Sequence, residues 1–102
     1  MANLHITEFS TQARDTAFGS ALVPAAQMPP VAEQTLAIGA TSAACTNAFN
    51  AATRFICLTA KADCHIQIGA APVATASMRP LTAGNDYYFG VTPGHKVAVI
   101  LP

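Results

Sequence analysis

The sequence predicts an all-β protein: an antiparallel β-sandwich or small barrel of about six or seven strands, with an extended N-terminal arm. Three observations lead to this fold class. Short runs rich in Ile, Val, Thr and aromatic residues alternate in polarity with period two. Turn residues separate these runs at intervals of about eight to twelve residues. A chain of 102 residues is long enough to bury one hydrophobic core.

The N-terminal segment, residues 1–33, reads as a short strand followed by an extended arm rich in proline and alanine. Asn3–Phe9 alternates in polarity, and Leu4 and Ile6 share one side. This strand is polar enough to lie at the edge of a sheet or to pair with another chain.

Residues 10–33 lose any clear period. A helical turn or two within Arg14–Leu22 fits the sequence, although Gly19 weakens it. Met28–Pro30 favours an extended, polyproline-like path. Segments of this length without regular structure tend to be functional or disordered. We expect either a loop that wraps its own sandwich or an arm that becomes ordered on a partner.

Residues 34–102 form the predicted β-sandwich core domain, because strand signals become dense from Gln34 onward. Gln34–Gly39 is a predicted strand, and Ala43–Ala48 is a weaker one made of small residues. Phe49 provides one large apolar side chain at the corner that follows.

The segment Arg54–Gly69 is predicted to be a central hairpin with a tight polar turn at residues 60–63. Its first strand is apolar on both faces, which is typical of a strand in the middle of a small domain. The pairing register places Cys57 and Cys64 on the same face, as diagonal neighbours. A disulfide is therefore not the expected state of these two cysteines.

A second hairpin is predicted from Asp86–Val91 and Lys96–Leu101. Pro93 and Gly94 suit a type II turn, since glycine accepts the positive φ that this turn requires. A longer or bulged connection is an equal alternative, because type II is not the favoured two-residue hairpin turn.

The composition restricts the classes of partner. Charged residues make up 10% of the chain and the formal net charge is zero, against about 25% charged residues in an average soluble protein. Either this is a small domain rich in alanine and threonine, or neighbouring subunits cover much of its surface, and we favour the second. The basic residues are scattered singly, which argues against nucleic-acid binding.

The N-terminus lacks the basic start and apolar run of a signal peptide, and no stretch reaches the length of a membrane span. We expect synthesis in the cytoplasm, no membrane partner, and cysteines that are reduced and buried.

No motif in the sequence predicts a cofactor, a metal or catalysis. Cys64 and His65 are adjacent, and adjacent strand residues point to opposite faces, so they do not converge on one ion. A thiol in the core has a raised pKa and is inert. Tyr88 is opposed in direction to Tyr87 and Phe89, and serves either core packing or an interface or sugar-binding face.

Three segments carry a resemblance to a known family: TLAIGATSAACTNAFNAATRFICL, DCHIQIGAAPVAT and NDYYFGVTPGHKVAVI. They resemble small proteins encoded among the virion genes of tailed bacteriophages. The resemblance covers Gln34–Ile100, about two-thirds of the chain, and it consists of turn and core residues, so no ligand residue is carried over.

The resemblance implies a structural virion protein, a capsid decoration (cement) protein on the exterior of the phage head. Its partners would be the major capsid protein and other copies of itself, in trimers, dimers or single copies. Alternatives are a head–tail joining or tail protein, and a host-surface carbohydrate-binding module. The side chains expected to contact partners come from the N-terminal strand, the proline-rich segment and one tyrosine: Leu4, Ile6, Phe9, Met28, Pro29, Pro30 and Tyr88.

Overall fold

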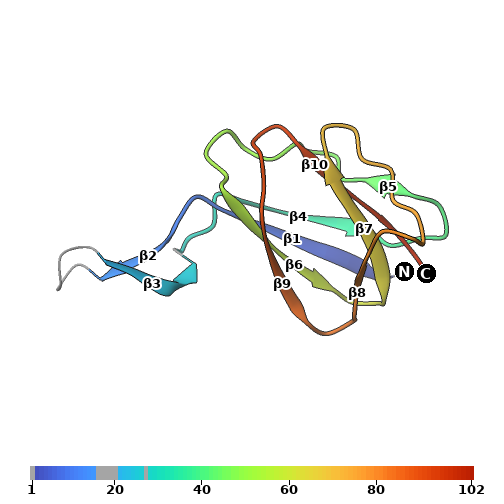
Figure 1. Cartoon of the computed structure of the whole chain (residues 1–102), viewed down its shortest axis with the longest axis horizontal. Coiled ribbons are helices and arrows are strands. Elements are labelled where there is room, and N and C mark those ends of the chain that lie inside the picture. Colours follow the sequence, from blue (N-terminus) through green and yellow to red (C-terminus); the bar gives the residue numbers. More distant parts are fainter. Residues whose placement is uncertain (1, 16–20, 27) are drawn as a thin grey trace.

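The structure is a computed structural model that describes residues 2–15, 21–26 and 28–102. Within these residues it contains ten β-strands and no helix. Eight strands form two four-stranded antiparallel sheets that pack face to face, and the other two form a separate hairpin (Figure 1). The predicted all-β sandwich is confirmed, with eight strands in the sandwich.

Sheet 1 has the strand order β4 (Ala32–Ala37), β1 (Asn3–Phe9), β6 (Phe55–Ala60) and β9 (Asp86–Gly90). Sheet 2 has the order β5 (Ala43–Ala44), β10 (Lys96–Ile100), β7 (Cys64–Gly69) and β8 (Arg79–Leu81). The hairpin consists of β2 (Gln12–Asp15) and β3 (Ala21–Ala26). Strands β2, β3 and β8 lie in segments for which the sequence predicts no strand.

Strand β1 lies inside sheet 1 and not at its edge. Leu4 is opposite Leu36 of β4 on one side and opposite Ala60 of β6 on the other. The expectation of an edge strand is wrong, because both neighbours lie far along the chain and leave no local signal. The sandwich therefore includes residues 2–9 and begins again at β4, and the arm is residues 10–31.

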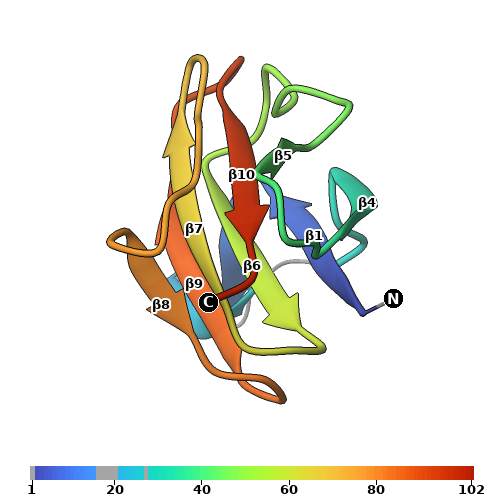
Figure 2. The same cartoon turned by 90° about the vertical axis from the view of Figure 1, so that its right-hand side faces the viewer.

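Both predicted hairpins are wrong in their pairing. Strand β6 pairs with β1 and β9, whereas β7 pairs with β10 and β8 in the other sheet. Strands β9 and β10 are likewise in different sheets. The short links 61–63 and 91–95 cross from one sheet to the other (Figure 2). Alternation identifies the buried face of a strand, but it does not specify which strand lies beside it.

The strand order is that of a jelly roll, the double-sheet arrangement of eight antiparallel strands. It differs from the usual jelly roll in chain order. The position between β4 and β6 normally belongs to the last strand, and here it belongs to β1, the first.

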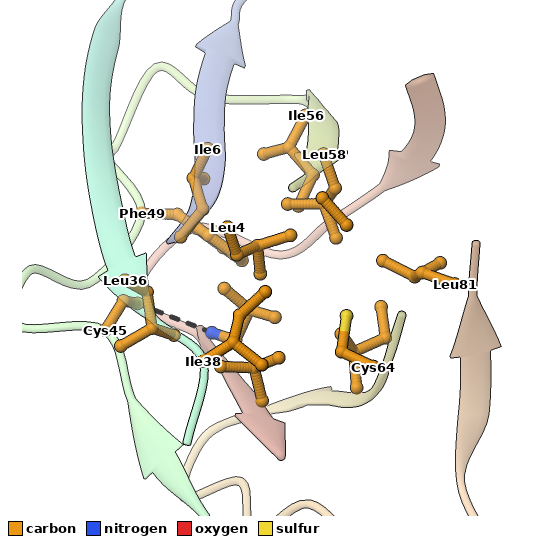
Figure 3. Packing of buried hydrophobic residues seen from close by; sticks show 14 residues of the cluster. Leu4, Ile6, Leu36, Ile38, Cys45, Phe49, Ile56, Leu58, Cys64 and Leu81 are labelled. Atoms are coloured by element: carbon orange, nitrogen blue, oxygen red, sulfur yellow. Dashed lines mark hydrogen bonds between the residues drawn. The ribbon is translucent and has the colours of Figure 1, made fainter. Parts of the chain in front are cut away.

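The inner faces of the two sheets form one apolar core (Figure 3). Each fully buried Leu, Ile or Val contributes about 1.5–3 kcal/mol relative to an exposed position. The core side chains are Leu4, Ile6, Leu36, Ile38, Cys45, Phe49, Ile56, Leu58, Ala60, Cys64, Ile66, Leu81, Val97 and Val99.

A buried carboxylate fixes the corner that leads into β6. Glu8, at 2% exposure, lies near the end of β1. Its Oε1 accepts hydrogen bonds from the Asn50 backbone N–H at 2.8 Å and from the Thr53 hydroxyl at 2.7 Å. Two hydrogen bonds compensate for the loss of water around this oxygen, as a buried polar group requires.

The arm projects from one end of the sandwich (Figure 1), and the principal extents of the molecule are 48 × 26 × 21 Å. Strands β2 and β3 pair with each other, with an irregularity between Gln12 and Arg14, and with no other described strand. The helical turn considered for Arg14–Leu22 is centred on residues 16–20, which lie outside the described residues. Its described flanks are strands.

Candidate protein-binding surface

The described residues contain no group of three or more His, Cys, Asp or Glu side chains that could hold a metal ion. All three cysteines are buried and free. Cys57 and Cys64 belong to different sheets, so their predicted placement on one face of a hairpin is wrong. Burial, followed by the charge of Asp63, raises the pKa of the Cys64 thiol, which makes it a poor nucleophile.

The outer face of sheet 1 carries an aromatic row, which we define as Phe9, Phe55 and Tyr88. The rings of Phe9 and Phe55 stack with centroids 5.2 Å apart, and those of Phe55 and Tyr88 are 6.4 Å apart. The three residues lie on the neighbouring strands β1, β6 and β9. The row begins at the residue that precedes the arm and crosses the sheet to its edge.

Tyr88 is 60% exposed at the outer end of this row. It lies opposite Cys57 across the β6–β9 pair. A hydrogen bond with the Cys57 side chain, aided by repulsion from Cys57 and Asp86 and by burial, raises the pKa of the Tyr88 phenol. The side chain is therefore neutral at physiological pH and presents an apolar ring with a polar tip, which is typical of interface tyrosines.

The predicted anchors of the N-terminal strand are not exposed. Leu4 and Ile6 are fully buried in the sandwich core. Phe9 is 5% exposed and stacks on Phe55 within the aromatic row on the outer face of sheet 1. Burial against their own chain leaves these three side chains no free surface for a partner. The sequence correctly placed Leu4 and Ile6 on one side of the strand, but that side is buried within this protein.

The predicted residues of the proline-rich segment lie on the return leg of the arm, between β3 and β4. Met28 is 62% exposed, Pro29 is exposed and Pro30 is half-buried. The Met28–Pro29 peptide bond is cis. Of the predicted residues, Met28 and Pro29 on this segment and Tyr88 on the sheet face are the exposed ones that a partner can reach.

Two further features of the surface were not predicted. Val73, in the segment between β7 and β8, is 65% exposed. It lies in a run of small residues whose sequence does not indicate which side chain is exposed. The free edges of the sheets also escape sequence reasoning, because they depend on which strands end up outermost.

No protein-family model matches this chain, and neither the curated proteins nor the solved structures provide a match. Among the described residues, no helix has the length and apolar character needed to cross a lipid bilayer. Function is therefore inferred from the surface of the protein.

Proposed function

We propose that this protein is a structural virion component, a capsid decoration protein that binds the outer surface of a tailed-phage head and stabilises it. Its partners in this proposal are the major capsid protein and other copies of itself. The observation that carries the proposal is the combination of a rigid sandwich with a projecting arm. A protein that clamps neighbouring capsid subunits needs both a fixed body and a segment that reaches beyond it.

The arm supports this role because its two described strands extend neither sheet of the sandwich. Strands β2 and β3 pair only with each other among the described strands. An isolated two-stranded hairpin is marginally stable in water and needs a further layer or strand. A capsid surface can supply that layer, either by strand addition or by covering one face.

The low charge supports the same role. Five basic and five acidic residues are spread over the chain, and protein interfaces are depleted in charge at their centres. Weak contacts are also sufficient for a decoration protein, since many copies attached to one lattice gain from multivalency. The resemblance of Gln34–Ile100 to small phage virion proteins points the same way.

Binding to capsids is the direct test. Undecorated heads are mixed with the full chain and with a variant in which residues 12–26 are replaced by a short Gly-Ser turn. We expect the full chain to co-sediment in hundreds of copies per particle and the armless variant to bind at least about tenfold more weakly. Deleting the first twelve residues would be a poor test, because it removes β1 from the middle of sheet 1.

The outcomes separate the parts of the proposal. Equal binding by both proteins keeps the decoration role and removes the arm from it. Failure of the full chain to bind heads contradicts the proposal, and a fixed count of about a dozen or fewer copies per particle favours the head–tail joining or tail role.

A carbohydrate-binding role is the second candidate, and the exposed Tyr88 supports it because sugars stack on accessible aromatic rings. Jelly rolls occur in lectin domains as well as in viral capsids. A glycan-array signal that is lost in Tyr88→Ala and kept in Tyr87→Phe would favour this role over decoration.

A further inference from the structure

The four outer strands of the sandwich differ in how well they are protected against pairing with another chain. A strand at a sheet edge presents free N–H and C=O groups, and proteins usually blunt such edges with proline, charge or short length. The edge strands are β5 and β8 in sheet 2, and β4 and β9 in sheet 1.

Both edges of sheet 2 are blunted. Strand β5 has only two residues. In β8, the pairing register with β7 directs residues 79 and 81 toward β7 and leaves Pro80 as the residue that faces outward. Proline has no N–H, so this edge has no donor to offer.

The edge of β9 is open over its whole length. The Val91 N–H donates to the Arg54 carbonyl, which makes residues 91 and 54 a hydrogen-bonded pair. In an antiparallel ladder such pairs alternate with non-bonded ones. Asp86, Tyr88 and Gly90 therefore direct their backbone N–H and C=O groups away from β6, and they have no backbone partner in the part of the chain that the structure describes.

Strand β4 is also open, since the Ile38 N–H donates to the Ala2 carbonyl and the same alternation turns Glu33, Thr35 and Ala37 outward. Its sequence, AEQTLA, is poor in residues that favour strands. The β9 sequence, DYYFG, has three aromatic residues in a row, and aromatic residues are enriched in strands. The β9 edge is thus the stronger template for pairing.

We propose that the β9 edge binds the β9 edge of a second copy of this chain, in antiparallel register about a two-fold axis at Tyr88. The result is a dimer with one continuous eight-stranded sheet made from the two copies of sheet 1. This inference does not depend on the proposed capsid role.

The backbone and the side chains both suit this register. Tyr88 opposes Tyr88 of the second copy, and Asp86 opposes Gly90 on either side. Each of these pairs exchanges two N–H···O bonds. No like charges are opposed, and the Asp86 carboxylate already accepts a hydrogen bond from Thr59 at 2.6 Å.

The two exposed Tyr88 rings become cross-strand neighbours on the outer face of the joined sheet. Cross-strand aromatic pairs stabilise antiparallel strands. The aromatic row would then continue from Phe9 and Phe55 of one copy to the same residues of the other. A two-fold contact of this kind is isologous, the commonest symmetry of soluble oligomers.

Proline substitutions test the edge without breaking the fold. Tyr88→Pro removes an N–H that faces away from β6, so every β6–β9 hydrogen bond is kept. The matched control is Thr35→Pro, which removes an outward N–H from the β4 edge of the same sheet. By analytical ultracentrifugation we expect a dimer for the unaltered protein and for Thr35→Pro, and a dissociation constant raised about tenfold or more in Tyr88→Pro.

Disulfide trapping decides the register even if a proline variant fails to fold. Cys57 faces Tyr88 within the chain, so the background is Cys57→Ala. Opposed residues of a hydrogen-bonded pair have Cα atoms about 5.5 Å apart, within the range of a disulfide. Tyr88→Cys in this background should form a covalent dimer on mild oxidation, and Thr35→Cys should not.

The other outcomes overturn the proposal. A monomer at all concentrations up to about 1 mM means that the edge is not self-complementary, since a dissociation constant above that corresponds to less than about 4 kcal/mol. A covalent dimer with Thr35→Cys alone places the contact at β4. A covalent product only in a mixture of the two cysteine variants indicates β9-to-β4 pairing, which gives rings such as trimers.

Discussion

The sandwich and the arm share two segments of the chain, yet their strands have different neighbours. Strand β1 of the sandwich leads into β2 of the arm, and β3 of the arm leads back into β4 of the sandwich. In the sandwich these segments bury Leu4, Ile6 and Leu36 against a second sheet. In the arm, β2 and β3 pair only with each other among the described strands.

An isolated two-stranded hairpin is only marginally stable in water, so backbone pairing alone contributes little. Net stabilisation by one hydrogen bond is about 0.5–1.5 kcal/mol, because unfolded groups bond to water, whereas a second layer adds the burial of apolar side chains. We therefore expect mutations in the sandwich to change the free energy of unfolding and changes in the arm to leave it nearly unaltered.

The largest effect is expected from Leu58→Ala, in the centre of β6. The Leu58 side chain is fully buried in the core, and truncation of such a leucine costs about 2–5 kcal/mol. Urea denaturation measures the loss. Thr7→Ala, on the outer face of the neighbouring strand, is the control and should cost less than about 1 kcal/mol. Similar values for the two variants would contradict the proposed core.

A somewhat smaller effect is expected where the arm begins. Glu8→Ala removes the acceptor of the Asn50 N–H and the Thr53 hydroxyl, and an unsatisfied buried polar group costs about 1–3 kcal/mol. Glu8→Gln keeps an acceptor oxygen and should lose less. The control is Glu33→Ala, which removes an exposed side chain whose Oε1 lies 3.3 Å from His5 Nε2, with an expected change within about 0.5 kcal/mol.

Truncation in the aromatic row should lower the free energy of unfolding by less than truncation in the core. Phe55→Ala removes a half-buried ring that contacts both Phe9 and Tyr88, and aromatic pairs contribute about 0.5–1.5 kcal/mol beyond their burial. Phe55→Leu restores most of the apolar area without the ring stacking. A thermal unfolding temperature of Phe55→Leu equal to that of the unaltered protein would mean that ring stacking has no role.

Replacement of residues 12–26 by a Gly-Ser turn should change the free energy of unfolding by less than about 0.5 kcal/mol, the usual limit for surface changes. Chemical denaturation of both proteins gives the comparison. A loss of more than about 2 kcal/mol would show that the arm packs on the sandwich.

The smallest expected effect is a difference between the pKa values of the two tyrosines, which absorbance measures. Both tyrosines of the chain lie in β9 and none lies in the arm. The Tyr87 oxygen accepts a hydrogen bond from the Thr82 N–H, which lowers the pKa of Tyr87, whereas the hydrogen bond with Cys57 raises that of Tyr88. Absorbance titration should show two steps as pH rises, Tyr87 first, and Tyr88→Phe should remove the later step. The armless variant should titrate identically.

The sequence specified the class of fold and the buried faces of its strands. The alternation in Asn3–Phe9 correctly placed Leu4 and Ile6 on one face of their strand, and that face is buried. What it could not specify was the partner of each strand. Arg54–Gly69 looks like a hairpin because a short polar link joins two apolar strands, but the same link also serves to cross between sheets.

The candidate site was predictable only where exposure follows from local sequence. Met28 and Pro29 lie in a segment without periodicity, and they are exposed. The predicted anchors Leu4 and Ile6 are buried because the second sheet, whose strands lie far along the chain, packs against them. The open edge of β9 depends on which strand lies outermost in the sheet and on which of its residues direct their backbone N–H and C=O groups outward. Neither can be read from the local sequence.

The hydrogen bonds of the two terminal segments have a consequence for engineering. The Ala2 carbonyl accepts from the Ile38 N–H at 3.0 Å, and the Gly39 carbonyl accepts from the Leu101 N–H at 2.9 Å, so both segments are held at adjacent residues. A short linker could therefore join them, with new ends opened inside the arm. The sandwich strands of this circular permutant would begin with β4 and end with β1, which is the chain order of an ordinary jelly roll.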